Sequence, residues 1–139
     1  MTARGWVGWV LRVTGGTMLF ALVFVVCPFG WMRAIHGRMG MGELGYTPLL
    51  SYLIRTLSAM YAILGALALF VSRDVERYGP VIRLLAWIGI LGGAGVTALD
   101  AGLGLPAFWT ATEGPLTVAL GAVLLALLAR LPKAAAQGN

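Results

Sequence analysis

The chain has 139 residues, of which 60% are hydrophobic and only 11% are charged. Its mean hydropathy of +0.89 lies far outside the range of soluble globular domains, so the composition predicts an integral membrane protein. The net charge of +5 is spread along the chain instead of forming a patch, which excludes a nucleic-acid partner from our expectations.

The chain contains four apolar segments that approach the length of about 20 residues needed to cross the hydrocarbon core of a bilayer. These segments are 7–28, 48–71, 80–101 and 109–131. We therefore expect an all-α fold, an antiparallel four-helix membrane bundle forming one transmembrane domain over 1–139. A cleavable signal peptide is the rival interpretation of the first segment, but Arg12 interrupts its apolar run and no small-residue cleavage site follows Val26.

The basic residues predict the orientation of these helices. With a cytoplasmic N-terminus, seven basic residues face the cytoplasm, against two or three on the other side. The seven are Arg4, Arg12, Arg73, Arg77, Arg83, Arg130 and Lys133. The positive-inside rule therefore predicts a multi-pass protein of a bacterial inner membrane, with both termini in the cytoplasm.

The segment 32–47 is predicted to be a glycine-rich outer loop that contains the only histidine, His36. Apolar residues alternate with basic ones here, which favours a short amphipathic segment on the membrane surface. A re-entrant or irregular cap agrees equally well, because glycine weakens regular helices. One imidazole can supply an axial bond to haem or a pigment. A lone loop histidine is more often a surface residue, so no cofactor is implied.

The second apolar segment carries Arg55 about two turns inside its start at Pro48. Small residues follow the same helical face, including Ser51, Ala62 and Gly65. Small faces allow close helix packing in membranes, so Arg55 is expected to face protein instead of lipid. A charge inside the bilayer either pairs structurally or marks a functional site.

Glycines predict the packing face of the third segment. Gly89 and Gly93 form a small-xxx-small pair, and the same face continues to Asp100 near the end of the segment. In the fourth segment Gly121 belongs to the expected packing face. Thr110 and Glu113 match the capping-box pattern that begins many helices, so Glu113 is expected to cap this helix.

Topology places six polar side chains near the outer ends of the helices. They are Arg55, Asp100, Glu113, Tyr52, His36 and Glu43. The leading interpretation is a structural ion pair of Arg55 with Asp100, Glu113 or both. A second is a pocket for a small ligand or lipid headgroup, since a guanidinium matches carboxylate and phosphate groups. Proton transfer through the two carboxyl groups is a third. The sequence contains no metal-ligand pattern and no catalytic motif, so an enzyme has no positive support.

The overall pattern resembles small four-helix bacterial membrane proteins of the DoxX-like type. The residues that carry the resemblance are Arg55 in Ser51-Tyr52-Leu53-Ile54-Arg55, Asp100 in Ala98-Leu99-Asp100-Ala101-Gly102, and Glu113 in Thr112-Glu113-Gly114-Pro115. This resemblance implies a functionally heterogeneous group, some of whose members are proposed accessory subunits of membrane oxidoreductases. It assigns no catalytic residue to this chain.

The sequence therefore favours a non-catalytic accessory or scaffold subunit within a larger membrane complex. Its expected partners are the lipid bilayer and other membrane subunits or further copies of the chain. The alternative is a protein that acts alone and binds a lipid or small hydrophobic ligand in an outer-leaflet pocket around Arg55.

Overall fold

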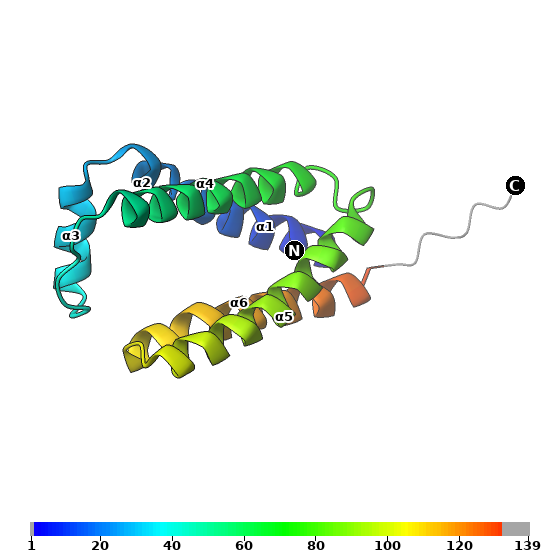
Figure 1. The fold of residues 1–139 in the computed structure, drawn as a ribbon. Helices are drawn as coiled ribbons and strands as arrows, with labels where there is room; N and C mark the ends of the chain where they lie inside the picture. Colours follow the sequence, from blue (N-terminus) through cyan, green and yellow to red (C-terminus); the bar gives the residue numbers. More distant parts are fainter. Residues whose placement is uncertain (1, 132–139) are drawn as a thin grey trace, which may run out of the picture. The chain divides into compact units, whose positions relative to one another are not determined.

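A computed structural model describes residues 2–131 of the chain, and every regular element in this range is an α-helix. The helices are α1 (Ala3–Leu19), α2 (Leu22–Val26), α3 (Phe29–Arg38), α4 (Pro48–Val71), α5 (Gly79–Leu103) and α6 (Ala107–Ala129) (Figure 1). Four spans of the described chain are long and apolar enough to cross a membrane: Ala3–Val26, α4, α5 and α6. The expected all-α class with four membrane-length helices is confirmed.

The described residues divide into two compact units, one formed by 2–10 with 71–131 and the other by 11–70. In the first unit α5 and α6 lie side by side (Figure 1). Their contacts pair Gly93 with Gly114 and Ala86 with Gly121, so the residue number rises on one helix as it falls on the other. The two helices are therefore antiparallel.

Glycine allows the backbones of α5 and α6 to approach closely. A methyl group added to Gly93 would lie 2.7 Å from the carbonyl oxygen of Gly114, and one at Gly121 would lie 2.5 Å from that of Ala86. Both distances are shorter than van der Waals contact, so alanine does not fit without a backbone shift. Gly89 is different, because a methyl group there would meet the Thr117 carbonyl oxygen at an ordinary 3.7 Å.

In the unit 11–70, α1 packs against α4 through a second pair of glycines. A methyl group on Gly65 would lie 2.7 Å from the carbonyl oxygen of Gly15, and the reciprocal distance is 2.8 Å. Gly65 was singled out by its place on the small-residue face of its helix. The sequence did not identify Gly15 as a packing residue, because its partner lies 50 residues further along the chain.

The first membrane span differs from the single helix expected over 7–28. It begins at Ala3, where the Thr2 hydroxyl accepts a hydrogen bond from the Gly5 amide at 3.3 Å. Around Phe20 and Ala21 the backbone hydrogen bonds run to the residue three positions earlier instead of four, and this change separates α1 from α2. The span then ends at Val26, before Pro28, because Pro28 lacks the N–H that the next helical bond requires.

The expected outer loop 32–47 is partly helical, since its first residues belong to α3. Pro28 precedes this helix at the N-cap position, where its missing N–H does no harm. After α3 the chain turns through Gly40 and Gly42, whose φ angles of 72° and 82° favour glycine. The following residues return to α3, where the rings of Tyr46 and Phe29 meet edge to face at 5.1 Å.

The capping box expected at Thr110 and Glu113 is wrong. The N-cap of α6 is Pro106, and it makes no side-chain capping bond. Its carbonyl accepts the amides of Trp109 and Thr110 instead, so Thr110 already lies within the first turn. The physical reason is Pro106 itself, whose fixed φ of −54° leads directly into the helix and moves the start ahead of the sequence pattern.

Candidate functional site

Arg55 is held by backbone carbonyl groups at the end of the first membrane span. Its guanidinium donates one hydrogen bond to the carbonyl of Val25 and another, at 2.9 Å, to that of Cys27. Its Nε donates to the hydroxyl of Ser51, one turn earlier on α4, at 3.3 Å. The side chain is half-buried and points toward protein, as the small-residue face of α4 suggests.

These carbonyls are available because of Pro28. The residue before a proline is driven out of the helical region, and Cys27 is extended at ψ 153°. The last carbonyls of a helix have no intrahelical partner, so a helix end inside a membrane needs other donors. A guanidinium at a helix C-terminus supplies donors and also a positive charge that complements the helix dipole. Arg55 therefore acts as a cap for the broken end of α2.

Reasoning from side-chain types missed this arrangement. The acceptors are main-chain oxygens of Val25 and Cys27, and residue identity says nothing about a free carbonyl. The useful signal was Pro28, which predicts both the helix end and the unbonded carbonyls before it. The side chain of Cys27 is itself buried.

The ion pair expected between Arg55 and the acidic residues stays a prediction. Arg55 belongs to the unit 11–70, whereas Asp100 and Glu113 belong to the other unit. Within the unit 11–70, Arg55 donates hydrogen bonds to three neutral oxygens. Neutral acceptors satisfy the directional needs of a guanidinium, but they do not neutralise its charge.

Asp100 lies in the last turn of α5 and is only 5% exposed. Its carboxylate Oδ2 is buried and accepts no hydrogen bond from the described part of the chain, residues 2–131. Its main-chain carbonyl accepts the Leu105 amide at 3.0 Å, next to Gly104, whose φ of 68° ends the helix. Asp100 therefore combines a satisfied backbone with an unsatisfied side chain.

Glu113 is half-buried on α6, and its carbonyl accepts the hydroxyl of Thr117 at 2.9 Å. Its place in the second turn follows from the start of α6 at Ala107. Glu113 and Asp100 both belong to the α5–α6 unit, on the two helices joined by the short turn at Gly104.

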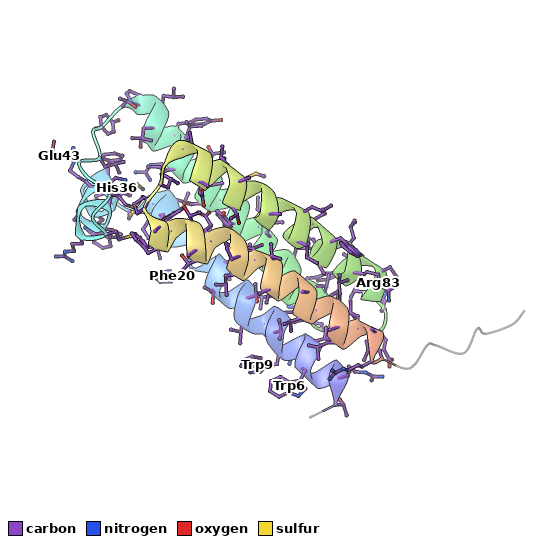
Figure 2. All side chains as sticks on the ribbon, turned by 90° about the horizontal axis from the view of Figure 1, so that it is seen from below. Trp6, Trp9, Phe20, His36, Glu43 and Arg83 are labelled. Carbon is purple, nitrogen blue, oxygen red and sulfur yellow. The ribbon has the colours of Figure 1, made fainter. Side chains whose placement is uncertain are left out.

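The remaining predicted site residues lie around α3 and the start of α4. His36 Nδ1 donates to the Gly42 carbonyl at 3.1 Å, so the histidine ties the returning chain to α3. Glu43 is the residue after Gly42 and is exposed. Figure 2 shows the side chains of His36 and Glu43 close to the same end of the structure. Tyr52 is 63% exposed on α4, which places its ring away from the protein interior.

A second polar region lies near the start of α1. Arg4 forms an ion pair with Glu76, whose side chain is 61% exposed, so the pair contributes little to stability. Arg4 and Arg130 also line an open surface cavity of about 400 Å³. Trp6 and Trp9 project from the first part of α1, with their rings edge to face at 5.7 Å (Figure 2). Exposed indoles next to basic side chains are typical of a membrane–water interface.

Comparison with protein-family models, with curated proteins and with solved structures finds no match to this chain. The resemblance to DoxX-like proteins therefore stays a hypothesis drawn from the residues around Arg55, Asp100 and Glu113.

Proposed function

We propose that this small polytopic membrane protein is a non-catalytic accessory or scaffold subunit of a bacterial inner membrane. It packs against other membrane helices, which belong either to different subunits or to further copies of the chain. The hypothesis of a DoxX-like relationship is in keeping with such a role, because accessory subunits are proposed within that group.

The observation that carries the proposal is an open glycine face on α5. Gly95, Ala98 and Gly102 are exposed and lie opposite the face that Gly93 and Asp100 bury. A methyl group added at Gly95 or Gly102 would meet nothing within 4 Å. Glycine in a helix costs about 0.5–1 kcal/mol relative to alanine, so the packing of the chain alone gives no reason for these glycines. A closely approaching helix from another molecule would give one.

Purification in a mild detergent, followed by native mass spectrometry, tests the proposal. The wild-type chain is expected to run as an oligomer or to retain another membrane protein. Gly95→Leu should abolish that association while the chain still folds, because the leucine fills the space that a partner helix needs. Ala119→Leu is the matched control, since Ala119 is an exposed small residue of α6.

A monodisperse monomer without a retained protein would contradict the scaffold role. A bound lipid or small hydrophobic molecule that disappears in folded Arg55→Ala would instead favour a protein that binds such a ligand alone.

A further inference from the structure

The cavity between the start of α1 and the end of α6 brings together two basic side chains that are far apart in the sequence. Its volume of about 400 Å³ falls in the usual range for sites that bind small ligands. All of its lining belongs to the unit formed by 2–10 with 71–131, so the cavity is a feature of that unit alone. The lining residues are Thr2, Ala3, Arg4, Arg130 and Leu131.

The membrane spans fix the depth of this cavity. Arg4 is the second residue of the span Ala3–Val26, and Arg130 directly follows the span Ala107–Ala129. Both side chains therefore lie where a helix leaves the hydrocarbon core, which is the level of the lipid headgroups. The exposed indole of Trp6, one turn after Thr2, is typical of the same level.

The charges at the cavity favour an anion with a single negative charge. Arg4 forms an ion pair with Glu76, so its positive charge is shared. The guanidinium of Arg130 has no hydrogen-bonding or ionic partner among residues 2–131. Two guanidinium groups and one carboxylate together carry a net charge of +1. A phosphodiester carries the opposite charge, and its oxygens suit the planar fork of a guanidinium.

We propose that this cavity binds the phosphodiester group of an anionic phospholipid, with Arg130 as the main contact and Arg4 as the second. The predicted orientation assigns the lipid to the cytoplasmic leaflet, where basic sites between membrane helices bind anionic headgroups. The inference does not rest on the scaffold role, because the open glycine face of α5 contributes no residue to the cavity. A soluble phosphate compound presents the same chemistry and is the second candidate source.

Native mass spectrometry of the full-length protein in mild detergent, with added phosphatidylglycerol, tests the site. The wild type should retain this lipid, and Arg130→Gln should weaken its binding at least about tenfold, the loss expected for one charge-assisted hydrogen bond. Arg73→Gln is the matched control. Arg73 is exposed and is predicted to face the same side of the membrane, but it does not line the cavity, so its loss should leave lipid binding unchanged.

Glu76→Gln should have the opposite effect. It releases Arg4 from the ion pair and should strengthen phosphatidylglycerol binding by about two- to fivefold, the range set by an exposed ion pair. Asp74→Asn is its control, because it removes the same charge from the same connection. Asp74 accepts the Arg77 amide at 3.1 Å, and an asparagine keeps an acceptor there. Equal gains in both variants would indicate general charge attraction and contradict a defined site.

Inorganic phosphate distinguishes the two sources. If the ligand is a lipid, excess inorganic phosphate leaves bound phosphatidylglycerol in place. If it is a soluble phosphate compound, inorganic phosphate displaces the lipid and raises the thermal unfolding midpoint of the wild type but not of Arg130→Gln.

The inference is overturned if Arg4→Gln and Arg130→Gln fold with the wild-type unfolding midpoint and bind phosphatidylglycerol and phosphate as the wild type does. Equal losses of lipid in Arg73→Gln and Arg130→Gln would also overturn it. Should one cavity variant fail to fold, the other decides, together with the gain expected in Glu76→Gln.

Discussion

At the scale of single residues, Arg55 illustrates how an expensive charge is used in an apolar segment. Its guanidinium joins two carbonyls at the end of α2 to α4, so one side chain satisfies a helix terminus and links two helices. Ser51 supports the geometry from the same face of α4. The planar fork of arginine suits this double contact, whereas a lysine ammonium is a single point charge.

Arg55→Lys is expected to lower the free energy of unfolding by about 1.5–3 kcal/mol, because at least one charge-assisted hydrogen bond is lost. Reversible unfolding in detergent measures the change. Hydrogen exchange should also become faster around residues 23–27, where the capped end of α2 is released. Arg38→Gln, which removes an exposed charge of α3, provides the control. Equal stability of the lysine variant and the wild type would show that the two carbonyl contacts add nothing.

At the scale of helices, glycine determines how closely neighbours approach. The α5–α6 contact and the α1–α4 contact both rest on reciprocal glycines, Gly93 with Gly114 and Gly15 with Gly65. Backbone contact of this kind gains van der Waals energy and weak Cα–H···O bonds, which matter in lipid because apolar burial drives no association there. Glycine position therefore decides helix pairing more than hydrophobicity does.

Gly93→Ala and Gly89→Ala form a matched pair on one helix, four residues apart. Gly93→Ala is expected to destabilise the protein by about 1–3 kcal/mol, because the methyl group meets the Gly114 backbone. Gly89→Ala has room and gains helix propensity, so it should leave stability unchanged or raise it by up to about 1 kcal/mol. Unfolding by a denaturing detergent measures both. The same loss in both variants would mean that propensity or lipid contact, and not close packing, governs these positions.

At the scale of the whole molecule, the apolar spans and the distribution of basic residues predict one orientation in the membrane. In a Cys27→Ala background, a cysteine at Glu43 should react with a membrane-impermeant maleimide in intact cells. A cysteine at Glu76 should react only after the cells are made permeable, since 72–78 is predicted to face the cytoplasm. Both positions are exposed, so reactivity reports the side of the membrane. The reverse labelling pattern would invert the predicted topology.

Several features of the molecule follow from sequence alone. The four spans can be found by length and hydropathy because crossing a bilayer is a local requirement on each segment. The extent of α4, from Pro48 to Val71, agrees with the expected range at both ends. The burial of Asp100 also follows from the spacing of the α5 glycines, since helical periodicity assigns it to their face.

Prolines locally set the break after Val26, the start of α3 and the start of α6 at Ala107, and their effect overrode the apolar pattern and the capping motif. Only the tertiary structure decided which groups satisfy Arg55. The partners of Arg55 are backbone oxygens that become available only once α2 has ended and α4 lies beside it. Residue types show where a buried charge needs a partner. Every residue has a main-chain carbonyl, so the sequence does not identify which carbonyls will accept a hydrogen bond, and only the fold does.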